Sequence, residues 1–111
     1  MNRMEHLLSI AAEEAVEVAQ RATKALRFGL NEVQPGQELS NLERMRGELC
    51  DLLAAFEMVY DEAGQRFGID LDAIAAKKAK VGKFLAYSRD LGTLTDGVPI
   101  PDQGKGESNG R

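Results

Sequence analysis

Apolar side chains recur at three- and four-residue steps through the first quarter of the chain, the spacing that places them on one face of an α-helix. The stripe consists of Leu7, Ala11, Ala15, Val18, Ala22, Ala25 and Leu26. It predicts a first helix over residues 4–28. Gly29 follows directly and predicts the helix end, because glycine readily takes the left-handed conformation that closes many helices.

A second helix is predicted to begin at Ser40, where a serine precedes Glu43 by three residues and forms a capping-box pattern. Proline and glycine in residues 30–39 predict a loop between the two helices. We expect the second helix to reach about residue 66, with Gly68 as its stop.

The centre of this second helix, residues 49–60, is apolar almost all round, which is typical of a helix buried on several sides. Its predicted main stripe consists of Leu42, Met45, Leu49, Leu52, Phe56, Val59, Tyr60 and Ala63. A second apolar face is predicted through Ala55, Met58 and Val59, with Glu48 and Asp51 on the same side.

Asp70 predicts the start of a third helix over residues 71–87, with Ile74, Val81 and Leu85 facing inward. No strand pattern competes with these helices. The sequence therefore predicts an all-α fold, an antiparallel bundle of three main helices.

The bundle is expected to occupy residues 1–90, and the glycine- and proline-containing residues 91–111 are expected to form a flexible tail. So short a domain buries a limited fraction of its surface. A stand-alone chain would also expose the second apolar face of the central helix. We therefore expect the bundle to be completed by oligomerisation, as a homodimer or homotetramer.

Composition narrows the possible functions. The net charge is −4, tryptophan is absent and no block of basic residues occurs, so nucleic-acid binding is disfavoured. The single cysteine excludes an intramolecular disulfide and fits a reducing compartment. The longest mainly apolar run is too short to span a membrane, and charges interrupt the N-terminal segment. We expect a cytoplasmic protein without a membrane partner.

Two pairs of acids stand out within apolar sequence. Glu14 and Glu17 form one pair, and Glu48 and Asp51 form the other. Each pair is spaced three residues apart, which places both carboxylates on one side of a helix. Acids facing one another need a counter-charge, and oxygen ligands suit Mg²⁺ or Mn²⁺. The four residues are predicted metal ligands.

The alternative is that these acids are ordinary charged helix residues. At ~100° per residue, Glu14 falls inside the first apolar stripe, Glu17 flanks it and Glu13 points outward. Asp51 lies among leucines, although aspartate is a poor helix former. Buried acids need partners, so a metal ion is favoured over a salt bridge from Asp51 to Arg44 or Lys24.

The run Glu13-Glu14-x-x-Glu17 followed by Glu48-x-x-Asp51 resembles the E-E-x-x-E … E-x-x-D signature of the all-α nucleoside triphosphate pyrophosphohydrolases, the MazG-like superfamily. The chain looks most similar to the short, single-domain members often found near phage genes. This resemblance implies hydrolysis of a nucleoside triphosphate, such as a deoxynucleoside or non-standard triphosphate, to the monophosphate and pyrophosphate.

The resemblance also implies residue roles. Glu14, Glu17, Glu48 and Asp51 would hold Mg²⁺ or Mn²⁺. Glu13, Glu14 and Glu17 would be the catalytic acids, with Glu13 helping to position the attacking water. No nucleophilic triad is present, so a metal-activated water is the available nucleophile.

Positive side chains are candidates for holding the substrate's phosphates. They are Lys24, Arg27, Lys77 and Lys80. A lysine-rich final helix is also typical of a solvated surface. Two other functions stay open: a phosphoribosyl-ATP pyrophosphohydrolase, and a non-catalytic helical oligomerisation or adaptor module.

Overall fold

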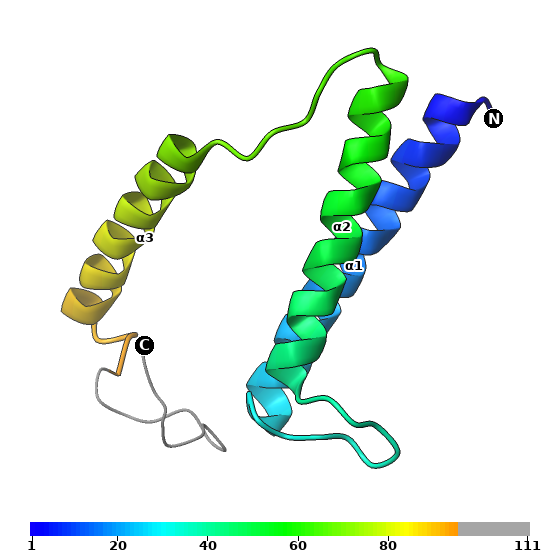
Figure 1. The fold of residues 1–111 in the computed structure, drawn as a ribbon. Helices are drawn as coiled ribbons and strands as arrows, with labels where there is room; N and C mark the ends of the chain where they lie inside the picture. Colours follow the sequence, from blue (N-terminus) through cyan, green and yellow to red (C-terminus); the bar gives the residue numbers. More distant parts are fainter. Residues whose placement is uncertain (96–111) are drawn as a thin grey trace. The chain divides into compact units, whose positions relative to one another are not determined.

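The computed structural model describes residues 1–95, and this part of the chain is all-helical (Figure 1). It contains α1 (Arg3–Phe28), α2 (Asn41–Glu62) and α3 (Leu71–Leu91), and no strand occurs in the described residues. The predicted all-α class and its three helices are confirmed. The tail predicted for residues 91–111 lies, from residue 96 onward, outside the described residues.

Two helices form a hairpin within the first compact unit, which includes residues 1–67. α1 and α2 run antiparallel and pack against each other (Figure 1). The buried and half-buried positions between them alternate in steps of three and four residues, as in a coiled coil. We call these positions the seam. They are Met4, Leu7, Ala11, Glu14, Val18, Arg21 and Ala25 on α1, and Asn41, Met45, Glu48, Leu52, Ala55 and Val59 on α2.

The seam differs from the predicted first stripe at its edges. Leu7, Ala11 and Ala25 are buried, as predicted. Ala15 and Leu26 are exposed, and Leu26 leaves 78% of its surface uncovered. A single partner helix covers a narrow strip, so the outer members of a wide apolar stripe stay exposed.

The face of α2 that packs on α1 takes residues from both predicted faces. Met45, Leu52 and Val59 of the predicted main stripe lie in the seam, together with Ala55 of the second face and Glu48. Leu49 and Phe56 of the main stripe and Met58 of the second face are exposed in the single chain. A helix that is apolar almost all round offers two faces, and its own sequence does not select between them.

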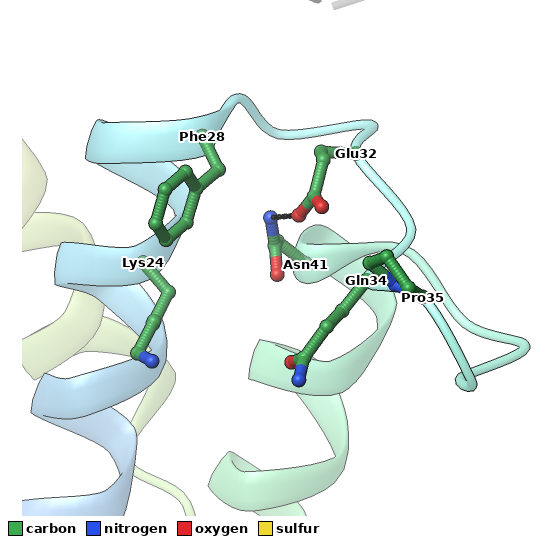
Figure 2. A pocket seen from close by; sticks show the side chains of 6 residues that line it. All are labelled: Lys24, Phe28, Glu32, Gln34, Pro35 and Asn41. Atoms are coloured by element: carbon green, nitrogen blue, oxygen red, sulfur yellow. Dashed lines mark hydrogen bonds between the residues drawn. The ribbon is translucent and has the colours of Figure 1, made fainter.

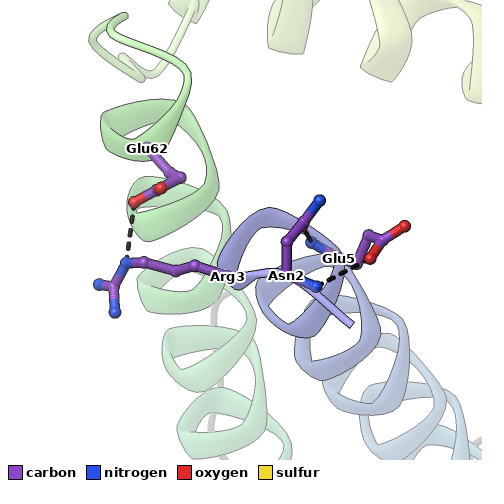
Figure 3. Close-up of polar contacts among 4 residues, drawn as sticks. All are labelled: Asn2, Arg3, Glu5 and Glu62. Carbon is purple, nitrogen blue, oxygen red and sulfur yellow. Dashed lines mark hydrogen bonds and ion pairs between the residues drawn. The ribbon is translucent and has the colours of Figure 1, made fainter.

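Capping residues fix the helix starts. The Ser40 hydroxyl accepts a hydrogen bond from the Glu43 backbone at 3.1 Å, and the Glu43 carboxylate accepts one from the Ser40 backbone at 2.9 Å. An equivalent box joins Asn2 and Glu5 at the start of α1 (Figure 3). The capping box predicted at Ser40 is confirmed.

The open end of the hairpin carries an ion pair. Arg3 Nε on α1 donates to Glu62 Oε1 on α2 at 2.8 Å (Figure 3). The Arg3 side chain is 67% exposed and the Glu62 side chain 34%, so water screens the pair and it adds at most about 1 kcal/mol. It holds the helix ends together farthest from the loop.

Glycines mark the helix ends. Gly29 has φ of 103° and caps α1, as predicted. α2 ends at Glu62 instead of residue 66, and the predicted stop at Gly68 is wrong. The chain already turns at Gly64, whose φ of 76° favours glycine.

α3 belongs to the second compact unit, which begins at Gly68. Asp70 caps it by accepting a hydrogen bond from the Ala73 backbone at 2.9 Å, as predicted. No residue of α3 is buried in the single chain, and Ile74, Val81 and Leu85, which are predicted to face inward, are all exposed. The helix extends to Leu91, four residues beyond its predicted end.

Replacing Ser40 by alanine is expected to lower the free energy of unfolding by about 1 kcal/mol. The change removes the side-chain acceptor at the start of α2. Chemical denaturation measures the loss, with Ser9→Ala on the exposed face of α1 as the control. Equal stability of the two variants would mean that the capping box contributes nothing.

Candidate functional site

Three carboxylates converge between the two packed helices. Glu14 and Glu17 on α1 and Glu48 on α2 each place one oxygen atom within 4.8 Å of the others. All three side chains are half-buried. Glu14 and Glu48 are themselves seam positions, which is why the hairpin brings them face to face. We call these three residues the acid cluster.

Asp51 and Glu13 lie at the edge of the acid cluster. Both are exposed, and Asp51 is not among the three converging residues. Asp51 is nevertheless close enough for its charge to raise the pKa of Glu14 and Glu48. The predicted partner Arg44 instead donates from Nη1 to Gln34 Oε1 at 3.0 Å. The structure therefore gathers three of the four predicted ligands directly and the fourth nearby.

The surroundings of Glu14 disfavour its charged form. Burial raises the pKa of this carboxyl, and the negative charge of Glu17 raises it further. The Oε1 atom of Glu14 is buried and has no hydrogen-bond partner among the described residues. A buried carboxylate oxygen without a donor is costly. A bound cation would supply the missing interaction.

Glu48 experiences the same surroundings from the opposite helix. Burial raises its pKa first, followed by the charge of Glu17 and a side-chain hydrogen bond between Glu48 and Glu17. Two carboxyls can share a hydrogen bond only when one of them holds a proton, so this contact favours the protonated form of Glu48. A divalent ion would replace that proton and neutralise the repulsion.

The acid cluster fits a small divalent ion in its donor chemistry. Mg²⁺ binds oxygen ligands at about 2.1 Å, so two oxygens on one ion lie at most ~4.2 Å apart. The observed separations reach up to 4.8 Å. Small side-chain rotations would close the difference, because the carboxylates are half-buried and not locked by other donors.

In the metal-free protein, Glu14 and Glu48 are expected to make the free energy of unfolding larger near pH ~5 than near pH ~7.5. Raised pKa values mean that the folded state binds protons more tightly than the unfolded state above the ordinary glutamate value of 4.5. Stability therefore falls as pH rises from that value through the raised ones. Glu43 acts oppositely and below 4.5, because its hydrogen bonds to Ser40 lower its pKa.

Thermal melting in EDTA measures this pH dependence. Saturating Mg²⁺ is expected to reduce it, because the ion competes with protons for the same oxygens. The double variant Glu14→Gln, Glu48→Gln is expected to lose the slope. A metal-free wild type whose melting temperature climbs steadily from pH ~5 to ~7.5 would contradict the raised pKa values.

Arg21 is a seam residue that the sequence prediction missed. It is 8% exposed, and its Nη1 atom has no hydrogen-bond partner among the described residues. The signal was present in the sequence, because Arg21 follows Glu14 by seven residues and therefore shares its face of the helix. Its position brings a positive charge into the same interface as the acid cluster.

A cavity of about 290 Å³ lies at the loop end of the hairpin (Figure 2). Its lining consists of Lys24, Phe28, Glu32, Gln34, Pro35 and Asn41. Asn41 is 2% exposed and donates from Nδ2 to the Gly29 carbonyl and to Glu32 Oε1, both at 2.9 Å. These bonds fix the loop against the start of α2. We call this cavity the loop pocket.

The predicted phosphate-binding residues lie in different places. Lys24 is half-buried and lines the loop pocket (Figure 2). Arg27 is exposed, with its guanidinium carbon 4.9 Å from the centre of the Phe28 ring. Lys77 and Lys80 are exposed on α3 in the second compact unit. Of these four, Lys24 is the residue that the hairpin itself places in a cavity.

A second cavity, apolar and about 280 Å³, lies beside the seam. Its lining consists of Val18, Leu42, Met45, Arg46 and Leu49. At ~100° per residue, Val18 and Glu17 leave the seam on opposite sides of α1. The hairpin therefore has an apolar side and a charged side.

Compared with known proteins, the chain matches no family model, no curated protein and no solved structure. Among the described residues, none of the helices is both long and apolar enough to cross a membrane. The functional interpretation therefore depends on the chain's own residues.

Proposed function

We propose that this chain is a Mg²⁺-dependent nucleoside triphosphate pyrophosphohydrolase, with Mn²⁺ as a possible substitute ion. The observation that carries the proposal is the convergence of Glu14, Glu17 and Glu48 from two helices. The resemblance of these acids to the MazG-like signature supports the same reaction class. Hydrolysis would yield the nucleoside monophosphate and pyrophosphate.

The acid cluster would hold the ion, with Asp51 joining from its exposed edge. When bound there, Mg²⁺ neutralises charge on phosphate oxygens and makes water a better nucleophile. Glu13, adjacent to Glu14 and exposed, would accept a hydrogen bond from the attacking water and so orient it. Water would form a bond to the phosphorus nearest the sugar while the bond to the leaving pyrophosphate breaks.

The nucleoside would occupy the loop pocket. Phe28 offers an aromatic surface, and Asn41 and Gln34 offer amide groups that can recognise a base (Figure 2). Lys24 would place its ammonium group near the phosphates, and we propose Arg27, three residues further along α1, as a second phosphate-binding residue. Positive groups fixed in this way stabilise the charge of the transition state.

We further propose that the chain acts as a homodimer or homotetramer in the cytoplasm. The apolar side of the hairpin supports association, because Leu42, Leu49 and Phe56 are exposed in the single chain. Burial of this side between copies would leave the charged side free for substrate.

The experiment is pyrophosphate release from a panel of ribo- and deoxyribonucleoside triphosphates, with Mg²⁺ and with EDTA. Metal-dependent release from at least one nucleotide is expected, together with equimolar monophosphate. Release from none of them, combined with a metal-induced rise in melting temperature, would turn attention to phosphoribosyl-ATP. Absence of both effects would favour a non-catalytic helical adaptor and reject the proposal.

A further inference from the structure

Arg21 occupies a position where a charge is costly. More than nine-tenths of the residue is buried between α1 and α2, and its Nη1 atom has no hydrogen-bond partner among the described residues. Arginine stays protonated in proteins, so it cannot avoid the cost by losing its charge. The folded protein would be more stable with an apolar side chain of similar length at such a position. A hydrogen-bond acceptor from a bound molecule would therefore stabilise Arg21.

The surroundings of Arg21 indicate the chemistry of that partner. Along α1, Arg21 follows Glu17 by four residues and precedes Lys24 by three, with a rise of ~6 Å and ~4.5 Å respectively. At ~100° per residue, the three side chains leave the helix within an arc of about 60°. The acid cluster, Arg21, Lys24 and the loop pocket therefore follow one another along the same side of α1.

A protein carboxylate does not fill the role. Glu17 is the nearest acid along the helix, but its carboxylate converges with those of Glu14 and Glu48. Nη1 of Arg21 has no hydrogen-bond partner among the described residues, Glu17 included. The missing partner must be an anion that also tolerates the adjacent carboxylates, which is the case for a phosphate chain whose neighbouring group is bound to a divalent ion.

We propose that Arg21 binds a phosphate group of the substrate, between the ion at the acid cluster and the nucleoside in the loop pocket. This inference rests on the proposed function and adds a substrate-binding residue to it. The planar guanidinium can donate two parallel hydrogen bonds to phosphate oxygens. Arg21 would thereby hold the phosphate chain against the ion at the acid cluster, where the water attacks.

The test compares Arg21→Met with the control Arg46→Met. Arg46 is an exposed arginine that lines the apolar cavity on the other side of the hairpin. The probes are Mg²⁺ alone and inorganic pyrophosphate in the presence of Mg²⁺, followed by thermal melting and calorimetry. Arg21→Met is expected to melt at or above the wild-type temperature and to keep the shift caused by Mg²⁺. Its affinity for pyrophosphate is expected to fall about 10- to 100-fold, whereas Arg46→Met keeps wild-type affinity.

Three outcomes overturn the inference. Wild-type affinity for pyrophosphate in Arg21→Met, with the Mg²⁺ shift intact, rejects Arg21 alone and leaves the proposed function standing. Absence of a Mg²⁺ shift in the wild type rejects the proposed function and the inference with it. If Arg21→Met fails to fold, Arg21→Gln decides the matter: a glutamine carries no positive charge, so unchanged affinity for pyrophosphate in that variant assigns Arg21 a structural role.

Discussion

Glu48→Gln is expected to reduce metal-dependent pyrophosphate release at least about 100-fold. Removing a group that only supports a metal ligand typically costs 10- to 100-fold in affinity or activity, so removing a ligand should cost no less. Glutamine retains the shape of Glu48 and one side-chain oxygen. It loses the negative charge that Glu48 places next to Glu14 and Glu17. Steady-state kinetics at several Mg²⁺ concentrations measure the loss.

Glu57→Gln is the matched control for this variant. Glu57 follows Glu48 by nine residues and therefore lies on the opposite side of α2, where it is exposed. It should retain wild-type activity. The activity of Asp51→Asn is expected to lie between those of Glu48→Gln and Glu57→Gln, because Asp51 is exposed at the edge of the acid cluster. Equal activity of Glu48→Gln and Glu57→Gln would contradict the assigned ligands.

Asn41→Ala is expected to lower the free energy of unfolding by about 2–4 kcal/mol, the largest stability loss that we predict for a single polar residue. The Nδ2 group of Asn41 donates to the Gly29 carbonyl and to Glu32 Oε1 within the buried loop junction. Alanine would remove both hydrogen bonds and leave the Gly29 carbonyl without this donor. Denaturant unfolding in EDTA measures the change without any contribution from a bound ion.

Asn31→Ala provides the comparison, because Asn31 is exposed in the same loop. A change within about 0.5 kcal/mol is expected for this surface position. If Asn41→Ala is no less stable than Asn31→Ala, the loop is held by other contacts. The backbone bonds from Asn41 to Glu32 and from Leu42 to Leu30, both 3.0 Å, would then be sufficient.

Local features were predictable because they depend on a few adjacent residues. The capping box at Ser40 needs only Glu43 three positions later, and the end of α1 needs only Gly29. The approach of Glu14 to Glu48 was also predictable, since Glu14 lies within an apolar stripe and Glu48 lies beside a second apolar face. Each acid had to face a partner helix, and the single loop of residues 29–40 made α1 and α2 neighbours.

Features that depend on a choice between two similar surfaces were not predictable. α2 is apolar nearly all round, so the sequence did not show that Met45, Leu52 and Ala55 would pack on α1 while Leu49 and Phe56 stayed exposed. Arg21 was missed for a related reason. An arginine in an alanine-rich helix is usually a surface residue, and only its seven-residue step from Glu14 places it in the seam.

The central claim is that the acid cluster binds a divalent ion, and Mn²⁺ titration monitored by the electron paramagnetic resonance of the free ion tests it most directly. Wild type, Glu48→Gln and Glu57→Gln would be titrated in parallel without nucleotide. Saturable binding in wild type and Glu57→Gln, lost or greatly weakened in Glu48→Gln, is the expected result. Three identical titrations, or no binding to the wild type, would contradict the claim.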